Sequence, residues 1–144
     1  MLTRRTFLGT LVGGLLTGRA AAQPLPPSDL RVNRMPIAFR SSSYTVGTGT
    51  DITATEPAGA AQDDILIALL NGAEPATYGL PAGWTSLYSG SNGTVHEFLV
   101  GYIRRGAGAP DLTFTVSTSV YREVIVADFS GVVTTGSPID SSSA

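Results

Sequence analysis

Short runs of apolar residues recur about every ten residues from Ile37 onward, with Gly, Pro, Ser and Asn between them. The runs are IAFRSSSYTV, DITATE, DILIALL, WTSLYS, TVHEFLVGYIRR, DLTFTVS and REVIVADFSGV. They are rich in β-branched and aromatic residues, which favour strands, and the residues between them favour turns. This pattern predicts an all-β domain.

Alternation within the runs predicts which strands are half-buried. In DLTFTVS, Leu112, Phe114 and Val116 occupy one face and threonines the other, as in a strand with one face in the core. DILIALL and EFLVGYI are apolar on both faces, so we expect central strands with both faces covered. Asn92-Gly93 predicts a hairpin turn between WTSLYS and VHEFLV.

These features predict a single antiparallel β-sandwich over residues 37–144, of jelly-roll or immunoglobulin-like kind. Residues 23–36 hold four prolines and no periodic pattern, so we interpret them as an extended linker.

The first 22 residues have the features of an export signal. Arg4 and Arg5 precede a short apolar stretch, and three alanines follow at residues 20–22. The arginine pair followed by Phe7-Leu8 resembles the twin-arginine signal, which exports folded proteins. An ordinary secretory signal and a retained anchor are the alternatives. The apolar stretch is too short for a membrane span, so we expect a periplasmic or extracellular mature chain with no span.

Composition narrows the range of partners. Cleavage after Ala22 would leave 6 of the 9 arginines against 11 acidic residues, a net charge of −5, and the chain has no lysine. A nucleic-acid-binding protein needs a basic surface, so we expect no nucleic-acid partner. The chain has no cysteine, which excludes disulfides and thiolate metal sites.

Four segments taken in order resemble a known type of domain. They are EPAGAAQDDILIALL, LPAGWTSLYSG, VGYIRRGAGAPDLTFTVSTS and ADFSGVVTTGSPID. Together they resemble a β-sandwich domain that recurs in bacterial exported proteins and in phage tail or particle-surface proteins. The resemblance implies a sandwich with a surface role and no catalytic residues.

Two departures from that domain bear on the prediction. Gln62-Asp63 stands where the domain has Gly-Asp, and the chain stops at PIDSSSA where relatives continue into further strands. We therefore expect either a short form of the sandwich or an open sheet edge. An open edge would recruit another strand, by self-association or from a partner.

Trp84, the only tryptophan, has two interpretations. As a ligand-binding residue it would stack on a sugar, with Tyr88 beside it on the same face of the strand. As a core residue it would pack against Leu66, Phe98 or Phe129. Tryptophan is highly buried on average, which favours the core.

Candidate chemistry elsewhere is sparse. His96 is the only histidine, and its neighbour Glu97 faces the opposite side of the strand, so the two cannot form a base and its orienting group. No Gly-x-Ser-x-Gly motif is present, and we expect no catalytic residues. Asp63 and Asp64 either cap a turn or supply oxygen ligands to calcium, the one cofactor we consider.

The sequence predicts an exported, non-enzymatic module for surface binding or adhesion, with a surface glycan as ligand. A structural component of a phage-like particle or tail is the first alternative. An accessory piece of an exported hydrolase is the second.

Overall fold

The computed structural model describes residues 36–73, 76–93 and 95–139. The predicted export signal, with Arg4 and Arg5, lies outside the described residues, as does all but the last residue of the predicted linker.

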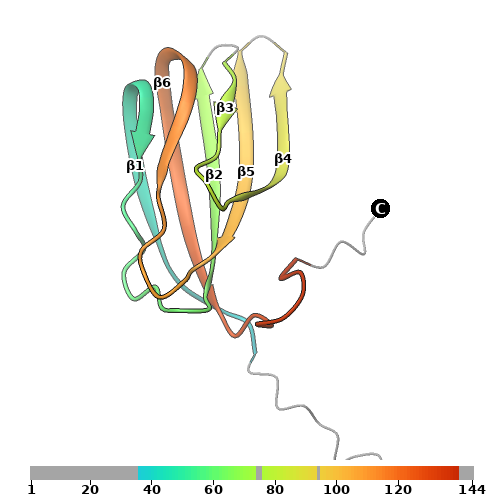
Figure 1. Ribbon diagram of the computed structural model, residues 1–144. Helices are drawn as coiled ribbons and strands as arrows, with labels where there is room; N and C mark the ends of the chain where they lie inside the picture. The colour runs from blue at the N-terminus through green and yellow to red at the C-terminus, as the bar shows by residue number, and fades with distance from the viewer. Residues whose placement is uncertain (1–35, 74–75, 94, 140–144) are drawn as a thin grey trace, which may run out of the picture. The chain divides into compact units, whose positions relative to one another are not determined.

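The chain forms one antiparallel sheet (Figure 1). Its strands are β1 (Ala38–Thr53), β2 (Ile65–Ala73), β3 (Tyr78–Gly79), β4 (Thr85–Asn92), β5 (His96–Arg104) and β6 (Thr113–Ser130). The hydrogen-bonded order is β1-β6-β2-β5-β4, and β3 pairs with β6 off this path. The all-β antiparallel class predicted from the sequence is confirmed.

Two long strands fold back on themselves, and this reversal organises the whole sheet. β1 and β6 both turn near the top of the view in Figure 1. Residues 38–49 of β1 pair with residues 120–130 of β6, and beyond the reversal residues 51–53 pair with 113–115. The ladder shifts register between Gly49 and Asp51, and the φ of Gly49 is 134°, which favours glycine. Four runs predicted as separate strands therefore form two.

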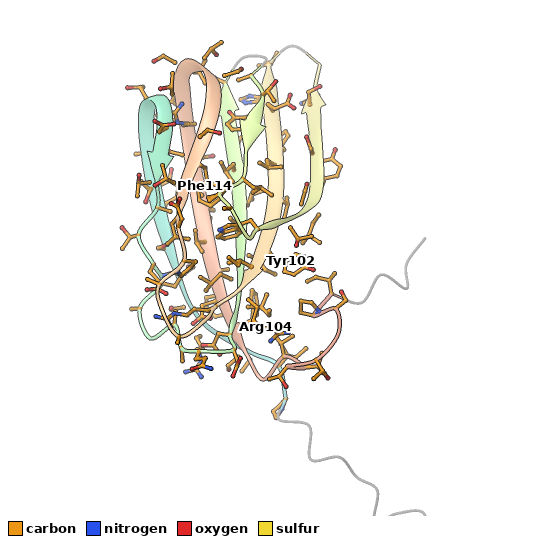
Figure 2. All side chains as sticks on the ribbon, in the orientation of Figure 1. Tyr102, Arg104 and Phe114 are labelled. Carbon is orange, nitrogen blue, oxygen red and sulfur yellow. The ribbon has the colours of Figure 1, made fainter. Side chains whose placement is uncertain are left out.

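The returning arms cover one face of the broad part of the sheet, which we call the inner face. Buried side chains of the arms and loops (Ile52, Ala54, Trp84, Leu112 and Phe114) pack with Leu66, Ala68, Leu70, Leu99, Val124 and Val126 of the broad part. Figure 2 labels Phe114 on the returning arm of β6, over the middle of the sheet. Leu112, Phe114 and Val116 are all buried, as their alternation predicts.

The hydrogen bonding joins all six strands into one folded sheet rather than two separate ones. The finer expectation of a jelly-roll or immunoglobulin-like sandwich stays a prediction.

A buried arginine fixes the reversal of β1. The side chain of Arg122 on β6 has no exposed surface. Its guanidinium donates hydrogen bonds to the carbonyl oxygens of Gly49 and of Asp51, the latter at 2.6 Å. These carbonyls lie on either side of the register shift, where the ladder between β1 and β6 is interrupted. Arg122 therefore supplies donors that the interrupted ladder lacks.

The position of β6 corrects one expectation. Of the two alternatives, a short form or an open sheet edge, an open edge at the last strand does not occur, because residues 122–129 of β6 pair with β1 on one side and β2 on the other. The edges are β1 and β4. On β1 the hydroxyls of Ser41 and Ser43 bond to carbonyls of residues 58 and 55, so the following segment lies along that edge. β4 is the exposed edge.

The predicted hairpin is present. β4 and β5 pair from Thr85↔Tyr102 to Asn92↔His96, and Gly93 begins the turn with a φ of 67°. Because the chain must adopt this left-handed conformation, Asn-Gly is well suited to the position.

Candidate binding surface

The face of the sheet opposite the returning arms, which we call the outer face, exposes large apolar side chains. On β2, Leu66, Ala68 and Leu70 are fully buried on the inner face, whereas Leu69 between them is 40% exposed. The same alternation holds on β6, where Val124 and Val126 are fully buried and Ile125 is 39% exposed. Around Leu69 and Ile125 the outer face is therefore apolar and open to solvent.

One row of residues crosses the outer face from edge to edge. It consists of Tyr44, Ile125, Leu69, Val100 and Tyr88, each the direct cross-strand partner of the next. We call these five residues the outer row. With neighbouring strands about 4.8 Å apart, the row spans about 19 Å. The tyrosines at its two ends are 59% and 58% exposed.

Aromatic residues continue beside the outer row. Tyr102 of β5, labelled in Figure 2, is the cross-strand partner of Ile67, and Phe39 packs edge-on against Phe129 with ring centroids 5.7 Å apart. Soluble proteins rarely expose a contiguous apolar area of this kind unless it is an interaction site.

The exposed outer face changes the prediction that β2 and β5 are central strands with both faces covered. β2 and β5 are flanked by strands on both sides, as their two apolar faces predict. Their outer face is covered at Ile65, which is 1% exposed, but not at Leu69, which is 40% exposed. The same apolar pattern that indicates a central strand therefore also marks the exposed surface. The sequence contains the outer row, but the alternation cannot tell a covered face from an uncovered one.

The ring of Tyr88 lies over Gly90, two residues further along β4. A Cβ placed on Gly90 would overlap the Tyr88 hydroxyl and come within 2.7 Å of its Cζ, so the ring extends over the Gly90 backbone. An aromatic ring over a glycine in an edge strand shields the exposed backbone there. Because the Tyr88 side chain is also largely exposed, the ring offers a surface on which a ligand can stack.

Trp84 does not share the face of Tyr88, contrary to the prediction. The ladder between β4 and β5 shifts register between Ser86 and Tyr88. The extra residue, Leu87, forms a β-bulge that breaks the alternation, so Trp84 points inward and Tyr88 outward.

Trp84 is a core residue. Its side chain is 9% exposed, its ring meets Phe114 edge-on with centroids 5.3 Å apart, and its Nε1 donates to the carbonyl of Asp111 at 3.0 Å. A surface platform at Trp84 does not fit this placement. Of the expected packing partners, Leu66 belongs to the same core cluster, whereas Phe98 and Phe129 pair on the outer face with Asn71 and Ile65.

A polar cluster interrupts the apolar outer face beside the outer row. Glu123 of β6 accepts a hydrogen bond from the Tyr44 hydroxyl at 2.8 Å and another from Asn71 Nδ2 at 3.0 Å. Tyr121 lies two residues before Glu123 on the same face. We call Glu123, Tyr44, Asn71 and Tyr121 the Glu123 cluster.

The hydrogen bonds of this cluster fix its charge. Donation from Asn71 and Tyr44 lowers the pKa of Glu123, so the carboxylate is ionised at neutral pH. The bond to that carboxylate raises the pKa of Tyr44 to about 12, because ionising the phenol would remove its donor and add a second negative charge. The outer face therefore carries a stable negative charge beside a protonated tyrosine.

The two predicted calcium ligands lie in a turn before β2. Asp63 has a φ of 71°, and its carbonyl accepts a bond from Arg104 Nη1 at 3.0 Å. The Asp64 carboxylate accepts from the Ala61 amide at 2.9 Å and pairs with Arg40 at 3.1 Å. Turn capping thus accounts for Asp64. Within residues 36–73, 76–93 and 95–139 no three His, Asp or Glu side chains lie close enough to share a metal.

A second carboxyl is buried near this turn, and the sequence did not identify it as such. Asp128 on the inner face of β6 has no exposed surface, and neither carboxyl oxygen has a hydrogen-bond partner among the described residues. Burial and the nearby charge of Asp64 raise the pKa of Asp128, and Arg40 and Arg105 oppose this only in part.

The raised pKa of Asp128 leads to a test of pH dependence. Below about pH 4 the carboxyl is protonated in both states. The unfolded chain loses this proton at a lower pH than the folded chain does. Asp128 therefore lowers the free energy of unfolding as the pH rises from about 4 to its raised pKa in the folded state. We expect Asp128→Asn to match the wild type in acid and to exceed its stability at neutral pH, by about 1–3 kcal/mol.

Denaturant melts of both proteins across this range measure the difference, which isolates Asp128 from titrations that the two proteins share, such as that of Glu123. An equal gap at every pH would contradict the assignment.

His96 lies on β5 with its ring 6.3 Å from that of Phe98. It is half-buried, and it lies on the same face of the sheet as Glu123, whereas Glu97 lies on the opposite face. No described helix is long and apolar enough to cross a membrane.

Comparison of the chain with protein-family models, with curated proteins and with solved structures gives no match in any of the three.

Proposed function

We propose that this chain is an exported, non-enzymatic binding module that attaches to a glycan surface through its outer face. The observation that carries the proposal is the outer row: five cross-strand neighbours form an apolar line about 19 Å long with a tyrosine at each end, and all but the half-buried Val100 are exposed.

Two features of this face favour a sugar as ligand. Tyrosine and aliphatic side chains can pack against the C–H faces of sugar rings, and Tyr88 is supported from below by the Gly90 backbone. The Glu123 cluster supplies polar atoms at one place beside the row, which can fix the orientation of a ligand held mainly by apolar contact. The export signal predicted over residues 1–22 would bring the module to a cell surface.

Binding to polysaccharides tests the proposal. Tyr88→Ala is expected to reduce retention of the full chain on an insoluble polysaccharide by about tenfold, because a buried aromatic contact at an interface contributes about 1–3 kcal/mol. Val95→Ala serves as the control, since Val95 is also exposed and apolar but lies at the tip of the β4–β5 hairpin, outside the outer row.

Pull-down on a panel of cellulose, chitin, chitosan, xylan and bacterial peptidoglycan provides the measurement. Failure of the folded wild type to bind any of them would contradict the glycan proposal.

A structural role in a phage-like particle or tail is the second candidate, and the exposed edge favours it. β4 has seven exposed residues of eight and contains no charged residue or proline, two of the features that protect sheet edges. The bulge at Leu87 and the Tyr88 ring over Gly90 protect this edge only in part. A neighbouring subunit could extend the sheet at β4. Binding of a calcium ion by Asp63 and Asp64 is a separate proposal.

A further inference from the structure

The negative charge of Glu123 lies on the outer face without an ion-pair partner. Its direct cross-strand neighbours are Val46 on β1 and Asn71 on β2. The described residues form two salt bridges, Arg40–Asp64 and Arg105–Glu56, and neither includes Glu123.

Within the cluster, Glu123 and Tyr44 offer hydrogen-bond acceptors to a ligand. The Tyr44 hydroxyl gives its only proton to Glu123, so the phenolic oxygen keeps only acceptor capacity. Each carboxylate oxygen of Glu123 accepts one bond from the protein and retains a further lone pair. A ligand that fits here must bring donors, and a positively charged donor fits best.

We propose that the Glu123 cluster binds the ammonium group of a glycan with free amino groups, of the glucosamine type. An ammonium carries three N–H donors and a positive charge, which match the carboxylate and the phenolic oxygen. This inference rests on the proposed function, because it assigns the outer row to the rings of the same glycan.

The position of the Glu123 cluster allows one glycan to place its sugar rings on the outer row and its ammonium group at Glu123. Tyr44 belongs both to the outer row and to the Glu123 cluster. A chain of sugar rings that lies along the row therefore reaches Tyr44 with its ring substituents beside Glu123. A lysine side chain of a partner protein would also bring an ammonium, but a line of exposed apolar side chains suits a linear series of rings better.

The test compares two oligosaccharides of equal length, one of glucosamine and one of N-acetylglucosamine, which differ in the charge of the amino group. Calorimetric titration of the full chain at neutral pH is expected to give at least tenfold tighter binding of the glucosamine oligomer. Added salt should weaken that binding and leave the binding of the acetylated oligomer unchanged, because only the charged contact is screened.

Two variants test whether the carboxylate of Glu123 binds the ammonium group. Glu123→Gln is expected to reduce affinity for the glucosamine oligomer by about 10- to 100-fold, the range for a hydrogen bond to a charged group, and to leave the acetylated oligomer unaffected. Asp51→Asn is the matched control, because it removes one exposed carboxylate at the reversal of β1, away from the cluster. It should change neither affinity.

The outcomes separate the inference from the proposed function. Equal affinity for the two oligomers, or equal loss in both Glu123→Gln and Asp51→Asn, overturns the ammonium assignment while glycan binding stands. Binding of poly-lysine but of neither oligomer overturns it in favour of a protein partner. No binding of any saccharide overturns both.

Discussion

Trp84→Ala is expected to lower the free energy of unfolding by about 3–5 kcal/mol, a large share of the stability of a small domain. The indole fills the space between the returning arm of β6 and the broad sheet, against Phe114. Its removal leaves a cavity and also leaves the carbonyl of Asp111 without the indole donor. Both effects act in the same direction.

Denaturant unfolding measures this loss, and Tyr88→Ala is the matched aromatic control. Tyr88 is exposed on the outer face, so its replacement should cost at most about 1 kcal/mol, the contribution of a cross-strand pair. Because Trp84 is the only tryptophan, its fluorescence reports on its own surroundings. We expect blue-shifted emission that resists acrylamide. Red-shifted, freely quenched emission with unchanged stability would contradict burial.

Arg122→Ala is expected to destabilise the fold by about 3 kcal/mol or more, because it removes two charge-assisted hydrogen bonds and creates a cavity. The carbonyls of Gly49 and Asp51 would lose their donors at the point where β1 reverses. Arg122→Met keeps most of the volume and removes the cost of burying a charge, so it should lose only about 1–2 kcal/mol.

Hydrogen exchange distinguishes this role from general core packing. In Arg122→Met the amides around the reversal of β1 should exchange faster, while those of β2 and β5 keep their protection. Uniform acceleration across the sheet would indicate that Arg122 only fills space.

The returning arms of β1 and β6 explain why the inner face is packed while much of the outer face is exposed. The returning arms of β1 and β6 are short, and they cover only the inner face. On the outer face, Ile65 is buried and Arg104 donates a hydrogen bond to the carbonyl of Val133, so described residues cover that end, whereas Leu69, Ile125 and Tyr44 stay exposed. Large exposed apolar patches mark interaction sites, so the exposed part of the outer face supports the proposed binding role.

The pattern of apolar and polar residues was enough to predict the strands and one of the turns. Alternation in DLTFTVS assigned Leu112, Phe114 and Val116 to the core, and Asn92-Gly93 located the hairpin between β4 and β5. These are local properties, because the direction of a side chain in a strand and the φ angles of a turn depend on adjacent residues.

Only the tertiary structure decided where the strands lie relative to one another. It placed β6 between β1 and β2 rather than at an edge, merged four runs into two strands, and put the bulge at Leu87 that turns Tyr88 outward. It also buried Arg122 and Asp128 and left Tyr44, Leu69 and Ile125 exposed. Strand order and register depend on contacts between residues far apart in the chain, whereas the alternation in the sequence is the same whether a face is covered or open to solvent.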